Sequence, residues 1–122
     1  MKRFAFALMV GLSGTSTAAL ADGDAARGKT LFSRCSACHA TTEQNKIGPH
    51  LSGVVGRAAG SMPGFAYSKA MVDYAKVWDD TTLDAFLAAP NKVVRGTKMT
   101  AGAMTNTRDR ADIIAYLREV SQ

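Results

Sequence analysis

The sequence predicts an all-α fold, and three observations lead to that prediction. Apolar residues recur at helical spacing in two stretches, at about residues 24–38 and 107–120. The alternation typical of strands never runs for more than a few residues. The chain has 122 residues, of which 47% are hydrophobic and 20% charged, enough for one small core and too apolar for intrinsic disorder. We therefore expect a single domain of helices joined by glycine-rich loops.

The N-terminal residues are expected to lie outside this domain. Two basic residues precede an apolar run over residues 4–12, and the sequence Ala-Leu-Ala follows at 19–21. This arrangement is typical of a secretory signal peptide. The apolar run is too short for stable membrane insertion, which needs roughly 20 apolar residues. We predict that residues 1–21 are cleaved and that residues 22–122 form the mature domain.

The charge of the mature domain gives little support for a nucleic-acid partner. Loss of Lys2 and Arg3 reduces the basic residues from 15 to 13, against 10 acidic residues. Neither a basic run nor a basic stripe interleaved with aromatic residues is present in the sequence. We therefore expect no nucleic-acid partner.

The first helix of the domain is expected over about residues 24–38. Asp22 or Asp24 would cap its N-terminus by accepting a backbone hydrogen bond. Gly28 lies on its apolar face, where the missing side chain permits close approach of another segment. This face predicts packing against a second apolar helix.

The last helix is expected over about residues 107–120, with Asn106 or Thr107 as its cap. Its apolar residues recur three or four positions apart, so they form one stripe. The stripe consists of Ile113, Ile114, Leu117 and Val120. We predict that this stripe packs against the first helix.

Two shorter helices are expected between the terminal ones. The first covers about residues 67–74. The second covers about residues 82–88, with Thr81 as its cap and Pro90 as its end, because proline cannot continue a helix. The remaining segments are expected to be loops.

The pentapeptide Cys35-Ser-Ala-Cys38-His39 is the most informative motif, and it uses both cysteines of the chain. Cys-x-x-Cys-His is typical of covalent c-type haem attachment. Two thiols three positions apart can each add to one vinyl group of the porphyrin, and His39 can bind the iron as proximal ligand. Export agrees with this interpretation, because this haem is attached outside the bacterial cytoplasm. We expect one haem c, bound through Cys35 and Cys38.

Two other uses of these residues fit less well. A thioredoxin-type redox pair needs a βαβ setting, which the sequence does not predict. A zinc site could recruit Cys35, Cys38, His39 and His50, but the adjacent Cys38 and His39 cannot easily both face one tetrahedral ion.

Further residues fall in order along the chain and extend over nearly all of the mature domain. They are Gly28, Phe32, Gly48-Pro49, Gly56-Arg57, Gly64-Phe65, Tyr67, Trp78, Gly96-Thr97-Lys98-Met99 and Ile114-Ala115-Tyr116-Leu117. Together with the haem motif, this series resembles the class I cytochromes c of mitochondria and bacteria. The resemblance implies three to five helices around one covalently bound haem, with the N- and C-terminal helices packed together.

The second axial ligand decides whether a haem iron transfers electrons or binds small molecules. The resemblance implies that Met99 is this ligand, and Met104 remains open as the alternative. Met71, at helical spacing from Ser68 and Tyr74, is expected to fill the core. His50 is expected to lie on the surface, as histidines more often do than bind metals.

The resemblance also implies roles for residues around the haem. The Pro49 carbonyl is expected to accept the proton of the second ring nitrogen of His39, which raises the basicity of the ligand. A further set is expected to hydrogen-bond or neutralise the buried propionates, which would be costly to bury unpaired. This set comprises Arg57, Tyr67, Trp78 and Thr97.

The chain departs from the family pattern at three positions near the expected haem. Phe86 stands where relatives commonly have a tyrosine whose hydroxyl reaches the methionine sulfur. Met71 replaces an asparagine, and Ala101 replaces an aromatic residue. We therefore expect a drier pocket on the methionine side.

The expected function is soluble electron transfer in the periplasm by a monomeric carrier that is not an enzyme. Redox partner proteins would dock at the exposed haem edge, near the cations Arg34, Lys46, Lys92, Arg95 and Lys98. Two alternatives remain open: a subunit of a periplasmic oxidoreductase complex, and a peroxidase or gas sensor with an open sixth position.

Overall fold

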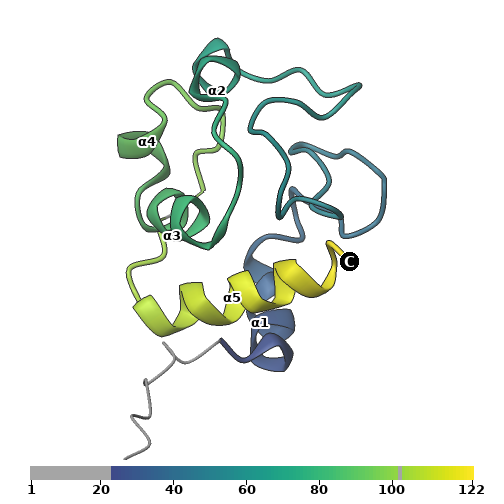
Figure 1. Cartoon of the computed structure of the whole chain (residues 1–122), viewed down its shortest axis with the longest axis vertical. Helices are drawn as coiled ribbons and strands as arrows, with labels where there is room; N and C mark the ends of the chain where they lie inside the picture. Colours follow the sequence, from purple (N-terminus) through teal and green to yellow (C-terminus); the bar gives the residue numbers. More distant parts are fainter. Residues whose placement is uncertain (1–22, 102) are drawn as a thin grey trace, which may run out of the picture.

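The computed structural model describes residues 23–101 and 103–122 of the chain. The described residues form five α-helices and one short 3₁₀ helix, η1 (Figure 1). In chain order these are α1 (Ala25–Leu31), η1 (Phe32–Arg34), α2 (Lys69–Tyr74), α3 (Asp80–Ala88), α4 (Pro90–Val93) and α5 (Thr107–Glu119). Within the described ranges the strand-like pairing is limited to an isolated bridge between Ala58 and Val77. The predicted all-α class is confirmed, whereas the predicted leader at residues 1–21 lies outside the described residues.

Helix α1 begins where expected and ends earlier than expected. Asp24 is its cap and accepts a hydrogen bond from the Arg27 N–H at 3.1 Å. The helix ends at Leu31, and the prediction that it continues to residue 38 is wrong. Beyond it the chain tightens, because the Cys35 N–H bonds to the Phe32 carbonyl three residues earlier. The haem motif therefore lies on a turn beyond α1 rather than on a helix.

The two terminal helices pack together as predicted, with α5 lying across α1 (Figure 1). Gly28 is buried at their contact, and a Cβ added there would lie 2.0 Å from the Asp112 carbonyl oxygen. The rings of Phe32 and Tyr116 meet edge to face, with centroids 5.4 Å apart. The missing side chain of Gly28 thus allows the two backbones to approach closely.

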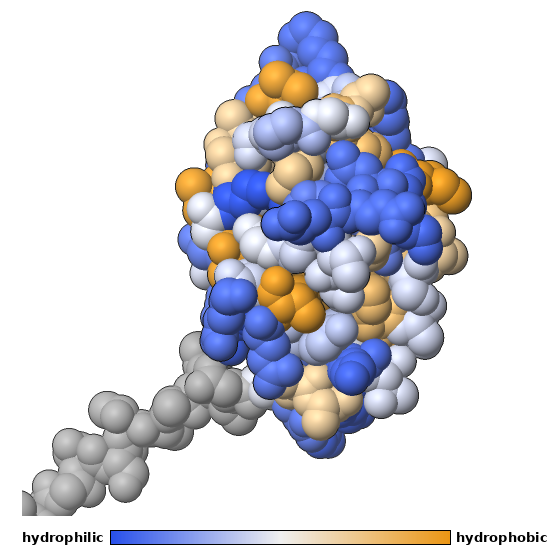
Figure 2. All heavy atoms as spheres, turned by 90° about the vertical axis from the view of Figure 1, so that its right-hand side faces the viewer, coloured by the Kyte–Doolittle hydropathy of each residue, from blue (hydrophilic) through white to orange (hydrophobic). Residues whose placement is uncertain are grey.

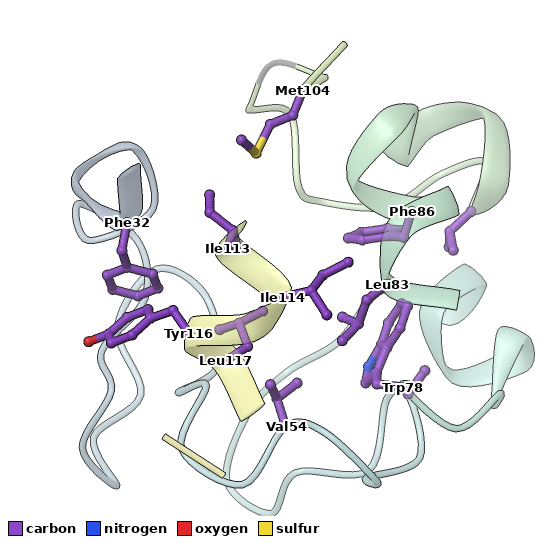
Figure 3. Packing of buried hydrophobic residues seen from close by; sticks show 12 residues of the cluster. Phe32, Val54, Trp78, Leu83, Phe86, Met104, Ile113, Ile114, Tyr116 and Leu117 are labelled. Carbon is purple, nitrogen blue, oxygen red and sulfur yellow. The ribbon is translucent and has the colours of Figure 1, made fainter. Parts of the chain in front are cut away.

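Helix α5 forms over nearly the predicted range, and Asn106 is its cap, accepting from the Asp109 N–H at 3.0 Å. Its predicted apolar stripe faces inward, and Ile113 is only 1% exposed. Other buried residues, including Trp78, Leu83 and Phe86, join this stripe in one core (Figure 3).

The shorter helices differ from the prediction at their ends. Helix α3 starts at Asp80 with Asp79 as its cap, so the prediction of Thr81 as cap is wrong. Asp79 prevails because its carboxylate accepts from the Thr82 N–H at 2.8 Å, while the Thr82 hydroxyl accepts from the Asp79 N–H, forming a capping box. Pro90 follows the end of α3 and is also the first residue of α4. Proline is tolerated there because the N–H of a first-turn residue has no partner within the helix.

The outer surface is largely polar on the face seen in Figure 2, where apolar side chains appear as separate orange spots. Within the part of the chain that is described, no helix combines the length and the apolar character needed to cross a bilayer.

A buried carboxylate ties the two terminal helices together. The side chain of Asp112 is only 3% exposed and accepts a hydrogen bond from the Asp24 N–H at 2.7 Å. It also pairs with the Arg27 guanidinium, which reaches Asp109 at 2.7 Å as well. The Asp24 N–H, followed by Arg27, holds the pKa of Asp112 below its ordinary value.

Asp112→Asn is expected to destabilise the protein at neutral pH and to lose this effect in acid. A carboxyl group whose pKa is lowered by folding adds stability above its unfolded pKa of about 3.9. That stability disappears as the pH falls through the lower, folded value. The denaturant midpoints of wild type and variant should therefore differ most at pH 7 and converge toward pH 3. A difference that stays constant over this range would contradict the assignment.

Candidate haem-binding site

A cavity of about 540 Å³ lies between the helices and the central loops. Its volume lies within the range of roughly 300–1,000 Å³ that is usual for sites of small molecules and cofactors. The structure brings all nine predicted site residues to its walls: Cys35, Cys38, His39, Pro49, Arg57, Tyr67, Trp78, Thr97 and Met99. Residues far apart in the sequence therefore meet around one space.

The cysteines approach the cavity from the turn that follows η1. Both are half-buried, and they are not joined in a disulfide. The Cys38 and His39 N–H groups both donate to the Cys35 carbonyl, at 3.0 and 2.9 Å, which fixes the turn. Burial raises the pKa of the Cys35 thiol. Two thiols and one imidazole therefore reach the same cavity from a single turn.

The imidazole of His39 is held by the loop at residues 48–49. Its Nδ1 lies 2.6 Å from the Pro49 carbonyl oxygen, the acceptor expected from the sequence. This acceptor makes Nδ1–H the donor and leaves the other ring nitrogen free to bind a metal. Burial lowers the pKa of His39, and the Pro49 carbonyl acts in the opposite direction. The lowered pKa favours the neutral ring, which is the form that coordinates iron.

Gly48 makes room for this ring. A Cβ at residue 48 would lie 2.4 Å from Cε1 of His39, closer than real side chains approach. The Gly48 N–H donates to the Cys38 carbonyl at 2.8 Å, which ties its loop to the haem motif. The sequence shows this glycine, but its contact with the ring is visible only in the fold.

Three methionines line the cavity away from this turn: Met71, Met99 and Met104. Met99 is half-buried, and its N–H donates to the Thr97 hydroxyl at 3.2 Å. Met104 is 8% exposed and belongs to the core. Met71 packs against the core as predicted, yet it also faces the cavity. Met99 and Met104 therefore both remain candidates for a thioether ligand.

The polar residues expected at the propionates lie along the same walls. Arg57 donates to the His50 carbonyl at 3.1 Å, and burial lowers the pKa of its guanidinium. The Tyr67 hydroxyl accepts from the Met62 N–H at 3.2 Å. Trp78 is 7% exposed, and its ring is tilted by 54° against that of Phe86, with ring centroids 5.1 Å apart.

His50 is buried, and the prediction that it lies on the surface is wrong. Its ring Nδ1 lies 2.7 Å from the Ser52 hydroxyl oxygen. Its backbone N–H donates to the side-chain carbonyl of Asn45 at 3.0 Å. Burial is possible because these neighbours satisfy its polar groups. His50 does not line the cavity. Its partners could not be identified from the sequence, apart from their nearness in the chain.

Three of the five predicted docking cations have intramolecular contacts. The Lys46 ammonium donates to the Ser36 carbonyl at 2.6 Å, and that of Lys98 donates to the Ala66 carbonyl at 2.9 Å. A guanidinium nitrogen of Arg34 lies 3.9 Å from a carboxylate oxygen of Asp109, and 60% of the Arg34 side chain is exposed. Lys92 and Arg95 are exposed.

The donor set and the lining fit a haem. Two thiols and a neutral imidazole come from one turn, thioethers come from a distant segment, and aromatic and aliphatic side chains fill most of the walls. No cluster of three or more His, Cys, Asp or Glu side chains suited to a bare metal ion occurs among the described residues. The zinc site considered from the sequence also needs His50, which does not line the cavity.

Comparison with known proteins agrees with this fit. A sequence model of the family described as cytochrome c matches residues 25–121. The chain belongs to the cytochrome c family. Like other members, this cytochrome c carries one covalently bound haem c, and it transfers electrons rather than catalysing a reaction.

Several relatives are similar over most of their length. Cytochrome c2 of Rhodomicrobium vannielii is 45% identical over 104 residues, which cover 84% of this chain and 83% of that protein. Cytochrome c of Euglena viridis is 49% identical over 98 residues, or 79% and 96% of the two chains. The solved structure of cytochrome cH from Methylobacterium extorquens matches with a TM-score of 0.77 and 44% identity, covering 80% of this chain and 99% of that one.

Proposed function

We propose that this cytochrome c is a periplasmic one-electron carrier whose haem iron is bound by His39 and Met99. The observation that carries the proposal is the single cavity that collects Cys35, Cys38, His39 and Met99 from two distant parts of the chain. The haem supplies exchange of one electron between ferrous and ferric iron. The residues around it bind, orient and shield that centre.

On the histidine side, the protein fixes both the position and the tautomer of the ring. The Pro49 carbonyl holds the Nδ1–H, and the space at Gly48 accommodates the ring edge. A fixed, neutral imidazole needs little rearrangement when the charge of the iron changes. This supports His39 as the proximal ligand.

On the methionine side, Thr97 supports the segment that carries Met99. The Met99 N–H bonds to the buried Thr97 hydroxyl, so the chain turns locally at this point. Phe86 and Met71 line the cavity without offering a hydroxyl or amide to a sulfur. A thioether that fills the sixth position disfavours the alternative of a peroxidase or gas sensor.

Arg57, Tyr67, Trp78 and Thr97 are proposed to hold the haem propionates. All four line the cavity and carry polar hydrogen atoms. Arg57 brings a charge that is already half-buried, and a carboxylate partner would compensate the cost of its burial.

The remaining parts of the proposal concern location and partners. A cleaved leader at residues 1–21 would deliver the chain to the periplasm, where c-type haem is attached. Redox partners would dock near the five cations named from the sequence, of which Lys92 and Arg95 are exposed. The chain would act as a monomer, and a subunit of an oxidoreductase complex is the alternative.

Met99→Ala tests the ligand assignment. In oxidised protein exported with its maturation machinery, this variant is expected to lose the weak near-infrared absorption of sulfur bound to ferric iron. Its midpoint potential should fall by on the order of 0.1 V, because axial ligands set haem potentials over about 0.8 V and methionine raises them.

Met104→Leu is the matched control, because it removes the other candidate sulfur and keeps an apolar side chain of similar size. The control should retain both the absorption and the potential. Loss of the absorption in Met104→Leu, with retention in Met99→Ala, would transfer the ligand role to Met104. Protein that came out without covalent haem would overturn the proposed function altogether.

A further inference from the structure

A buried arginine outside the cavity wall holds the segment that carries Met99. Arg110 lies in the first turns of α5, and its side chain is only 11% exposed. Its Nε donates to Asp84 of α3 at 2.7 Å. One of its terminal nitrogens donates to the carbonyls of Met104 and Thr105, at 2.8 and 3.2 Å. The buried guanidinium therefore donates to two backbone carbonyls that follow Met99 in the chain.

Met104 is held at both of its backbone polar groups. Its N–H donates to the Leu87 carbonyl near the end of α3 at 2.9 Å, and its carbonyl accepts from Arg110. Asp84 and Leu87 both belong to α3, so Arg110, Met104 and α3 form a closed ring of contacts. Figure 3 shows the Met104 side chain pointing toward Ile113 of α5. This ring fixes one end of the segment in place.

The described residues between Met99 and this ring have no backbone partner among the described residues. Thr100, Ala101 and Ala103 are exposed, and they form no backbone–backbone hydrogen bond with another described residue. On the other side, Met99 is held by the Thr97 hydroxyl. Such stretches open locally at low cost, unless an anchor at their end prevents it. Met104 and Arg110 provide that anchor.

We propose that Arg110 is a positioning residue that holds the backbone at Met104 and Thr105 and thereby keeps Met99 at the cavity wall. It acts through the Met104 and Thr105 carbonyls, and Asp84 orients its guanidinium. The proposal rests on Met99 as the ligand for its effect on the iron, whereas its effect on the segment stands independently. Planar, forked donors are needed for this task, because one guanidinium reaches a carboxylate and two carbonyls at once.

Arg110→Lys is the test, with Arg118→Lys as the matched control. Both arginines join α5 to α3: Arg118 contacts Asp80 at 2.9 and 2.7 Å, about two helical turns further along α5. Both variants keep the positive charge and lose the fork. Only the first variant removes the clamp on Met104.

Hydrogen exchange of the haem-loaded protein measures the opening of the segment. In Arg110→Lys, the amides of Met99 and Met104 are expected to exchange about 10- to 100-fold faster, as loss of charge-assisted hydrogen bonds implies. The amides of Ile113 and Leu117, inside α5, should change no more than in Arg118→Lys. The sulfur-to-iron absorption should also disappear at a lower denaturant concentration than the helical signal.

Equal acceleration of the Met99 and Met104 amides in the two variants would overturn the proposal, as would unchanged exchange in Arg110→Lys. If Arg110→Lys fails to fold, Asp84→Asn decides, because Asp84 is 45% exposed on its side chain and its loss only disorients the arginine. Asp84→Asn should accelerate the same two amides, and no acceleration would refute the clamp. Absence of the sulfur absorption in the wild type would instead refute Met99 as ligand and leave the exchange result valid.

Discussion

Gly28→Ala is expected to separate α1 from α5 and to lower the free energy of unfolding by about 3 kcal/mol, the upper end of the usual range for overpacked cores. The added Cβ would lie 2.0 Å from the Asp112 carbonyl oxygen and 2.9 Å from the Cβ of Tyr116. The first of these neighbours is backbone, so no rotamer change can relieve the clash. The two helices must therefore move apart.

The separation has further costs at the same interface. It would lengthen the contacts of Asp112 with the Asp24 N–H and with Arg27. Chemical unfolding of the haem-loaded protein, followed by circular dichroism, measures the effect. Lys29→Ala, at an exposed neighbouring position of α1, is the control and should change the midpoint little. A midpoint for Gly28→Ala that equals this control would refute the close approach.

Gly48→Ala is expected to impair the histidine side of the site. Its Cβ would lie 2.4 Å from Cε1 and 2.8 Å from Nδ1 of His39, so the ring must turn away or the loop must shift. Either movement breaks the 2.6 Å contact with the Pro49 carbonyl. Disturbing such a partner of a metal-binding histidine usually costs 10- to 100-fold in metal affinity, and we expect a loss of about this size.

The share of exported chain that carries haem and the midpoint potential of that haem measure this effect. Gly53→Ala is the matched control, because an added Cβ there meets no atom within 4 Å. With φ of 71°, residue 53 adopts a left-handed conformation, so alanine should cost about 1–2 kcal/mol of stability. The control should therefore lose stability and keep its haem spectrum. An unchanged haem content and midpoint potential in Gly48→Ala would show that residue 48 does not restrict the ring.

Local features of the fold could be predicted from the sequence, and non-local ones could not. The α5 stripe and its Asn106 cap follow from spacing and from the chemistry of a single residue. α1 ends just before Phe32, whose ring packs against Tyr116 far away in the chain. Asp79 and Thr81 are both possible caps by composition, and the reciprocal contact with Thr82 decided between them. Boundaries set by tertiary packing are thus the least predictable part of a helix.

The site shows the same division. Cys35, Cys38 and His39 are adjacent in the chain, so their joint chemistry can be inferred from spacing alone. The burial of His50 depends on whether Ser52 and Asn45 meet its polar groups, which spacing does not reveal.

The amino-acid sequence alone determined the cofactor chemistry and the helical class, because the haem motif and the helical periodicity are properties of neighbouring residues. The tertiary structure decided that nine separate residues surround one cavity. It also decided that Arg110 donates hydrogen bonds to the Met104 and Thr105 carbonyls, which follow Met99 in the chain. Such contacts join residues whose meeting depends on the path of the whole chain, and a buried charge or carbonyl finds its partner only when that path is complete.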